Sequence, residues 1–151
     1  MAKIALSMIC APRDDEAIEL DRCLTSVKPA VDDIFVTITG SNKKVSEVLS
    51  KHGAKEFHCI WEGDFSKARN FAISKATKDW ILSIDADESI SNSDCLKIKE
   101  LCKNEEADAF LLDWRNYTND IGIAGWKSGG GDRYEESKKA AGFYNAQVLR
   151  L

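Results

Sequence analysis

The stretch FSKARNFAISKATKDWILSIDADE, residues 65–88, contains a short apolar segment that ends in acidic residues. The mostly apolar run from Ile81 to Ile84 is followed by Asp85, Ala86, Asp87 and Glu88. A short apolar run of this kind predicts a buried strand. Three carboxylates within four positions repel one another, so a compensating group is needed. A metal ion, a ring of backbone N–H groups or water at a surface turn could each supply it.

On either side of this stretch, strand-like and helix-like segments alternate along the chain. The second helix has Ser41 as its expected N-cap and Gly53 as its expected C-terminal stop. The third helix is expected to place Phe65, Ala68, Ala72 and Ala76 on one side. The alternation predicts a mostly parallel sheet with helices on both faces. The expected strands are 4–10, 33–39, 55–61 and 79–85, and the expected helices are 14–29, 41–53, 64–77 and 91–104.

The pattern changes after residue 106. Residues 108–118 and 142–151 both read as strands, and the glycine-rich segment 119–141 between them is predicted to be a long loop joining an antiparallel pair. We therefore expect one domain, 1–151, with a β/α part at 1–106 and a strand–loop–strand part at 107–151. Because the chain stops inside an apparent strand, it is predicted to be part of a longer protein, and a homodimer through the last strand is expected.

Composition limits the classes of function. The chain has 151 residues, 44% of them apolar, and a net charge of −4, which predicts a globular protein and gives no electrostatic case for binding nucleic acid. No apolar run is long enough to predict a membrane span. Five cysteines without a Cys-x-x-Cys pair indicate reduced thiols and a cytoplasmic location.

The acids after the fourth predicted strand are candidate metal ligands. In open parallel sheets, ligands bind beyond the carboxyl ends of the strands. If the segment stays extended, Asp85 and Asp87 point to the same side and can converge on one hard cation. The alternative is a solvated turn at the end of a strand. Glu88 is predicted to be a residue of the approach to the next helix or of the surface, rather than a ligand.

Residues 65–88 closely resemble the central stretch of family 2 glycosyltransferases, in which a helix carrying Ala-Arg-Asn leads into a strand that ends in Asp-x-Asp. The similarity extends upstream through DEAIELDRCLTSVKPAVDDIFVTITG, VSEVLSKHGAK and WEGDF, and covers about residues 3–90. It implies a Rossmann-like GT-A fold, a three-layer α/β sandwich. It also implies a nucleoside diphosphate sugar as donor and an acceptor, whether glycan, lipid or protein, that the sequence does not identify.

The resemblance also implies roles for individual residues. Asp87, with Asp85 beside it at the ribose or the metal's water shell, would hold Mg²⁺ or Mn²⁺ on the diphosphate. Arg69 would lie near the nucleotide; its alternative is a surface salt bridge. The donor-binding set that follows consists of Ala11, Pro12, Glu16, Thr39, Arg69, Asp85, Ala86 and Asp87.

The sequence departs from the family pattern in two places. Ile38 stands where most members have an aspartate that faces the base, so the base is not predicted. The first loop, APRDDEA, differs from the usual Lys-Asn-Glu. The general base for inverting transfer is expected near or beyond the C-terminus. A non-catalytic binding or assembly module with the same fold is therefore the alternative to an enzyme.

Overall fold

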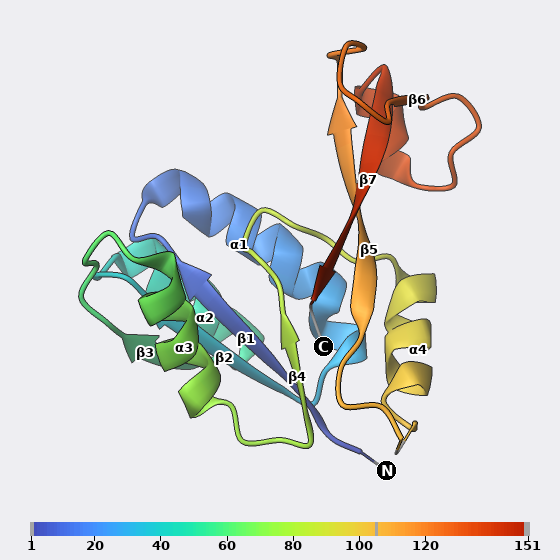
Figure 1. Cartoon of the computed structure of the whole chain (residues 1–151). Coiled ribbons are helices and arrows are strands. Elements are labelled where there is room, and N and C mark those ends of the chain that lie inside the picture. The colour runs from blue at the N-terminus through green and yellow to red at the C-terminus, as the bar shows by residue number, and fades with distance from the viewer. Residues whose placement is uncertain (1, 105, 150–151) are drawn as a thin grey trace. The chain divides into compact units, whose positions relative to one another are not determined.

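The computed structural model describes residues 2–104 and 106–149. The chain divides into two compact units, Met1–Asp108 and Ala109–Leu151 (Figure 1), called here the first and the second unit. Each unit has its own sheet. Within the described residues, no helix combines the length and the apolar character that a membrane crossing requires.

The first unit is built on a four-stranded parallel sheet, as predicted. Its strands are β1 (Ile4–Cys10), β2 (Asp33–Ile38), β3 (Lys55–His58) and β4 (Trp80–Ser83), in the order β3-β2-β1-β4. The central strand β1 is buried almost throughout. A strand covered on both faces has no side that favours polar residues, which explains its continuous apolar sequence.

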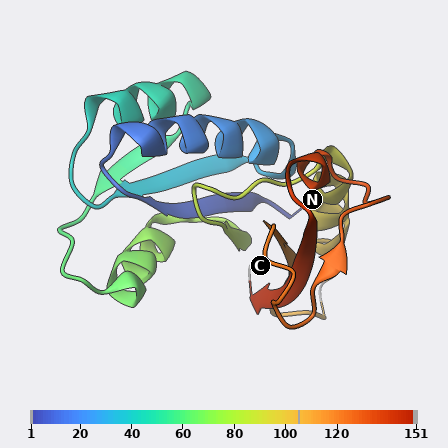
Figure 2. The ribbon, with the colours of Figure 1, turned by 90° about the horizontal axis from the view of Figure 1, so that it is seen from above.

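Helices cover both faces of this sheet, which confirms the predicted layers (Figure 2). The helices α1 (Asp14–Val27) and α2 (Lys43–His52) pack together on one face, and α3 (Phe65–Lys75) packs on the other. A further helix, α4 (Asn92–Leu101), packs against the short 3-10 helix η1 (Lys28–Ala30). The sheet is thereby enclosed as the middle layer of a three-layer sandwich.

The ends of α2 show one correct and one wrong prediction. Gly53 ends the helix in a left-handed conformation with a φ of 69°, which a residue without a Cβ adopts at little cost. The N-cap is Asn42 rather than Ser41: the Asn42 side chain accepts a hydrogen bond from the Val45 N–H at 3.1 Å. Both residue types cap helices well, so the sequence alone did not distinguish these neighbours.

The buried side of α3 is narrower than predicted. Ala68 and Ala72 are buried, but Phe65 is 60% exposed. Phe65 is the first residue of the helix, and its ring packs on Trp61 in the preceding segment instead of on the sheet. The small buried alanines let α3 lie close to the sheet.

The second unit is an antiparallel sheet in the order β5-β7-β6, which confirms the predicted antiparallel strands. Its strands are β5 (Leu111–Thr118), β6 (Lys127–Ser128) and β7 (Gly142–Leu149). The predicted loop 119–141 is not structureless, because it contains β6 and the 3-10 helix η2 (Glu135–Lys139). Residues 150–151 of the predicted last strand lie outside the described residues.

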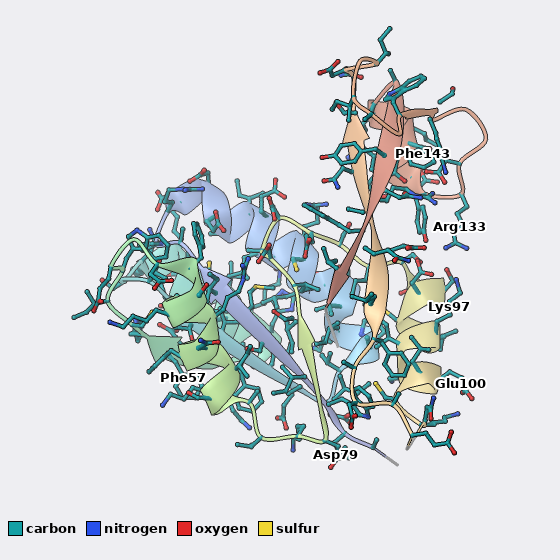
Figure 3. The ribbon with its side chains drawn as sticks, in the orientation of Figure 1. Phe57, Asp79, Lys97, Glu100, Arg133 and Phe143 are labelled. Carbon is teal, nitrogen blue, oxygen red and sulfur yellow. The ribbon has the colours of Figure 1, made fainter. Side chains whose placement is uncertain are left out.

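One polar cluster attaches this loop to the strands. The Asp132 carboxylate accepts hydrogen bonds from the Arg115 guanidinium and, at 2.6 Å, from the Tyr117 hydroxyl. The Arg115 guanidinium also lies 4.2 Å from the centre of the Phe143 ring, whose position is shown in Figure 3. Burial, and the hydrogen bond to Asp132, raise the pKa of Tyr117 to about 12. Tyr117 therefore remains a hydrogen-bond donor at neutral pH.

The cap of α2 gives a first testable prediction. Asn42→Ala removes the cap and the hydrogen bond from Asn42 Nδ2 to Asp14 Oδ1 at 3.0 Å. The variant is expected to lose about 1–2 kcal/mol of unfolding free energy. Ser41→Ala is the matched control and is expected to change it by less than about 0.5 kcal/mol. Urea unfolding followed by circular dichroism measures both; equal losses would contradict the assignment of Asn42 as the cap.

Candidate functional site

The carboxyl ends of the four parallel strands form one edge of the first unit, called here the strand-end edge. The chain moves outward from β1 to β2 and β3 and then returns to β4 on the other side of β1. The strand order therefore reverses beside β1, which is the place where open α/β sheets bind ligands. Every predicted donor-binding residue except Glu16 and Arg69 lies just after one of these strands: Ala11, Pro12, Thr39, Asp85, Ala86 and Asp87. Glu16 lies in the first turn of α1, and Arg69 lies on α3.

The segments after β1 and β2 pack directly against each other. The Thr39 N–H donates to the Cys10 carbonyl at 3.0 Å. Gly40 sits under the Pro12 ring: a Cβ built on Gly40 would lie 2.9 Å from Pro12 Cγ. A side chain at position 40 would push Pro12 away, so the glycine permits this close approach. Ala11, Pro12 and Thr39 thus form one half-buried wall of the strand-end edge.

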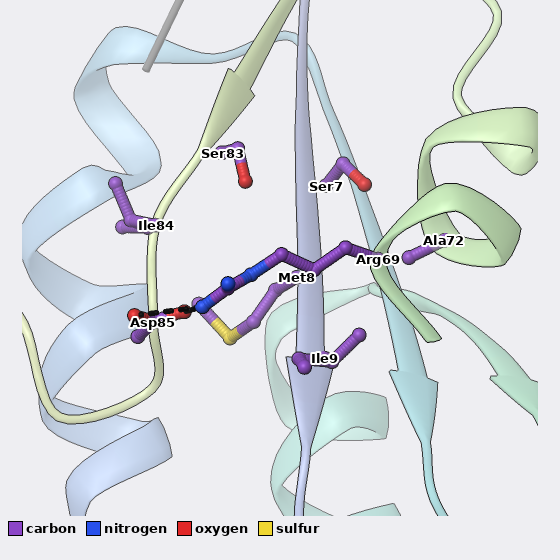
Figure 4. A pocket seen from close by; sticks show the side chains of 8 residues that line it. All are labelled: Ser7, Met8, Ile9, Arg69, Ala72, Ser83, Ile84 and Asp85. Carbon is purple, nitrogen blue, oxygen red and sulfur yellow. Dashed lines mark hydrogen bonds and ion pairs between the residues drawn. The ribbon is translucent and has the colours of Figure 1, made fainter. Parts of the chain in front are cut away.

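Arg69 and Asp85 are joined at the centre of this edge. The Arg69 side chain extends from α3 past β1 to Asp85 (Figure 4). Its Nη2 lies 2.9 Å from Asp85 Oδ1 and 3.3 Å from Oδ2. The pocket there is lined by Ser7, Met8, Ile9, Arg69, Ala72, Ser83, Ile84 and Asp85, and these side chains leave no room in it for a water molecule. Because the two side chains are 43% and 37% exposed, the ion pair contributes less than about 1 kcal/mol.

Asp85 and Asp87 do not continue an extended segment, so that prediction is wrong. β4 ends at Ser83, and Ala86 and Asp87 lie in a turn. The turn is closed twice: the Glu88 N–H donates to the Asp85 carbonyl at 3.1 Å, and the Asp85 N–H donates to Glu88 Oε2 at 2.8 Å. Glu88 is consequently a structural partner of Asp85 rather than a simple surface residue.

Asp87 is the acid of this turn with the most freedom. Its residue is exposed, and its carbonyl accepts a hydrogen bond from Arg22 Nη2 at 2.6 Å. Among the described residues, none donates a hydrogen bond to its carboxylate. Glu16 lies close enough to be affected by its charge: burial first, and then the charge of Asp87, raise the pKa of Glu16. The Arg13 guanidinium, 2.9 Å from Glu16 Oε2, opposes this shift.

The described residues hold no cluster of three His, Cys, Asp or Glu side chains arranged to bind a metal ion. Mg²⁺ often uses only one or two carboxylates and completes its shell with water and ligand phosphates. A cation of that second kind would need no more than the Asp87 and Asp85 carboxylates from the protein. Asp85 could take part only after releasing Arg69.

The thiols below this edge are inert. All five cysteines are free. Cys10 and Cys23 are buried, and burial raises the pKa of each to about 12. Cys23 Sγ lies 3.6 Å from the Asp85 carbonyl, so its role is to pack under the turn. Neither thiol is a nucleophile at neutral pH.

Two features of the edge were not predicted from the sequence: Arg22 and the role of Glu88. The end of the third strand was predicted wrongly, because β3 ends at His58 instead of continuing to Trp61. Trp61, expected in that strand either in the core or at its surface, lies after it and is 42% exposed. Arg22 lies three residues after Glu19, a spacing that suggests a local ion pair, and this ion pair forms at 2.7 Å. The spacing does not indicate the hydrogen bond that Arg22 donates to the Asp87 carbonyl.

The shifted carboxyl gives the second prediction. The pKa of folded Glu16 is raised, so the ionised form destabilises the fold, and the penalty grows as pH rises through the carboxyl range. Glu16→Gln is expected to raise the unfolding free energy at pH 7 by up to about 1 kcal/mol. The gain should vanish below the ordinary glutamate pKa of about 4.3. Thermal unfolding at pH 3.5 and pH 7 measures it.

Glu19→Gln on the exposed side of α1 is the control and should show no such gain. An equal effect of Glu16→Gln at both pH values would contradict the prediction, because a pH-independent gain cannot arise from the Glu16 charge.

The model of the family described as "Glycosyl transferase family 2" matches residues 14–149. A TPR repeat-containing protein of Synechococcus elongatus is 44% identical over 112 residues, which are 74% of this chain and 27% of that protein. The glycosyltransferase SunS of Bacillus subtilis is 31% identical over 91 residues, which are 59% of this chain and 22% of that protein. The chain thus spans about a quarter of the length of these two relatives.

Solved structures show the same fold at low identity. The crystal structure of residues 1–349 of S. aureus TarS matches with a TM-score of 0.62 and 15% identity, covering 94% of this chain and 46% of that one. A second TarS structure matches with a TM-score of 0.64. The expected Rossmann-like GT-A architecture is confirmed by this likeness and by the parallel sheet with its antiparallel strand group.

Proposed function

This chain belongs to glycosyl transferase family 2, and we propose that it supplies the donor-binding half of an enzyme that transfers a sugar from a nucleoside diphosphate sugar. The observation that carries this proposal is the strand-end edge itself. It places a guanidinium, an exposed carboxylate and a closely packed half-buried wall around the point where strand order reverses. Those are the groups that a diphosphate with its cation, and a ribose, require.

In this proposal Asp87 holds Mg²⁺ or Mn²⁺, and Asp85 lies at the ribose or in the metal's water shell. The cation supplies charge stabilisation for the leaving diphosphate. Asp87 suits this task because its carboxylate faces solvent and its main chain is fixed by Arg22. The nearby charge of Glu16 adds to the negative potential that attracts a cation.

Arg69 has two uses in the proposed reaction. Without donor it neutralises Asp85. With donor bound, Arg69 contacts the diphosphate, which carries more charge than one carboxylate and therefore competes with Asp85 for the guanidinium. Ala11, Pro12 and Thr39 would border the base and ribose from one side, and Ala86 would offer its backbone in the turn.

A second candidate is a non-catalytic nucleotide-sugar-binding or assembly module. Ile38, which stands where most family members have an aspartate, and the altered first loop APRDDEA favour it. A turnover assay distinguishes the two candidates. An enzyme hydrolyses or transfers the sugar in a manner that depends on Asp87, whereas a binding module neither hydrolyses nor transfers it. The five free thiols support a reducing compartment, the cytoplasm, for either one.

The metal assignment gives the third prediction. Calorimetric titration of UDP and GDP, with and without Mn²⁺, should show binding that requires the metal. Asp87→Ala should weaken it by about tenfold or more, the order expected when one charged contact is lost. Glu100→Ala, on α4 (Figure 3), is the matched control and should bind both nucleotides with the affinity of the wild type.

Two results would contradict this assignment. One is nucleotide binding of equal affinity with and without Mn²⁺. The other is an Asp87→Ala variant whose metal-dependent affinity equals that of the wild type.

We also propose a homodimer through the C-terminal strand. β6 pairs with β7 only at Gly142 and Phe143. Among the described strands, none pairs with the rest of that edge of β7, and such an edge can pair with a second copy. Light scattering should therefore show a mass that rises from monomer to dimer with concentration. A constant monomer mass at high concentration would contradict the proposal.

A further inference from the structure

An exposed apolar patch, formed by Ile60, Trp61 and Phe65, lies between β3 and the first turn of α3. The exposed fractions of these side chains are 84%, 42% and 60%. The Trp61 and Phe65 rings pack edge to face with centroids 4.8 Å apart and planes at 69°. Neighbouring exposed aromatics forgo the burial that normally stabilises them, so a patch of this kind indicates a binding surface.

The patch is held in place by its flanking residues. The Asp64 side chain caps α3 by accepting a hydrogen bond from the Lys67 N–H at 3.1 Å. Glu62 forms an ion pair with the Lys67 side chain. Gly63 between them has a φ of 76°, which turns the chain sharply. The two rings are therefore presented by an ordered turn, so little conformational entropy is lost when they bind a partner.

The patch adjoins the strand-end edge. Phe65 lies one turn before Arg69 on α3, and the Arg69 guanidinium carbon is 5.9 Å from the Phe65 ring centre. Arg69 in turn contacts Asp85. On the other side, His58 Nδ1, at the end of β3, is 2.7 Å from the Gly40 carbonyl. The aromatic rings thus continue the line that runs from Asp85 through Arg69 toward the ends of β2 and β3.

The end of β2, at Ile38–Gly40, offers no carboxylate. Ile38 is fully buried, and Gly40 is covered by Pro12. A planar heterocycle that lies near Arg69 therefore finds two aromatic rings and a guanidinium, and no carboxylate from β2. Aromatic rings and guanidinium planes bind such heterocycles by stacking.

We propose that Trp61 holds the base of the nucleoside diphosphate by stacking, with the Phe65 ring, whose plane lies at 69° to that of Trp61, packed against it edge to face. The inference rests on the proposed function, and it adds how the base is recognised: by its aromatic face rather than by hydrogen bonds to β2. The distances are suitable, since β4 and β3 are three strand spacings apart, about 14 Å, and an extended nucleoside diphosphate covers such a span. Because every base has a stacking face, the site accepts uracil and guanine alike.

The test compares nucleotides with a ligand that lacks a base. Calorimetry in Mn²⁺ measures UDP, GDP and inorganic pyrophosphate on wild type, Trp61→Ala, Trp61→Phe and Leu96→Ala. Trp61→Ala should weaken UDP and GDP binding by about tenfold, the loss of one base–aromatic stack, and leave pyrophosphate binding unchanged. Trp61→Phe should keep most of the affinity. Leu96, 71% exposed on α4, is the matched control and should behave as wild type.

Several results would overturn the inference. Equal affinity of wild type and Trp61→Ala for both nucleotides would remove the stacking role. A loss for pyrophosphate as large as the loss for UDP would show a structural role instead, and thermal unfolding of Trp61→Ala reports such damage directly. Vesicle binding that is lost in Trp61→Ala, with nucleotide affinity unchanged, would assign the patch to a membrane.

The proposed function fails in a different way. If wild type binds neither UDP, GDP nor pyrophosphate in Mn²⁺, both the proposed function and the stacking role are overturned. If wild type binds all three and only Asp87→Ala loses them, the donor site stands and the stacking role alone is wrong.

Discussion

The ion pair between Arg69 and Asp85 sets the charge balance at the centre of the strand-end edge. It connects α3 to the turn after β4, on opposite sides of β1. The cluster of three acids in that turn would otherwise repel itself. Arg69 neutralises Asp85, the Asp85 N–H binds Glu88, and Arg22 anchors the Asp87 carbonyl. The protein's own groups thus offset the repulsion, and Asp87 is the acid left free for a ligand.

Much of the fold could be predicted from the sequence because it depends on local periodicity. The apolar run Ile4–Cys10 became β1 with the same bounds, and the alternation of strands and helices became a parallel sheet with helices on both faces. Elements that depend on distant partners were less accessible. β6 has two residues and exists because it pairs with Gly142 and Phe143. No sequence pattern within residues 119–141 predicts that pairing.

The site was predictable in its location but not in its conformation. Apolar residues followed by acids placed Asp85 and Asp87 at the end of a strand, where the structure has them. The turn at Ala86 and Asp87 was predicted only as the alternative, because it depends on the Glu88 side chain folding back to the Asp85 N–H. Trp61 was assigned to a strand because periodicity counts aromatic residues as apolar, whether they are buried or presented for binding.

The weakness of the central ion pair suits the proposed function. A half-exposed pair of this kind is worth less than about 1 kcal/mol, so breaking it costs little. A diphosphate offers the Arg69 guanidinium more negative charge and more acceptor oxygens than one carboxylate does. In the proposed function, a diphosphate would take Arg69 from Asp85 at small expense and leave the Asp85 carboxylate free to lie toward a cation held by Asp87. In this way donor binding itself would complete a metal site that the protein does not hold assembled beforehand.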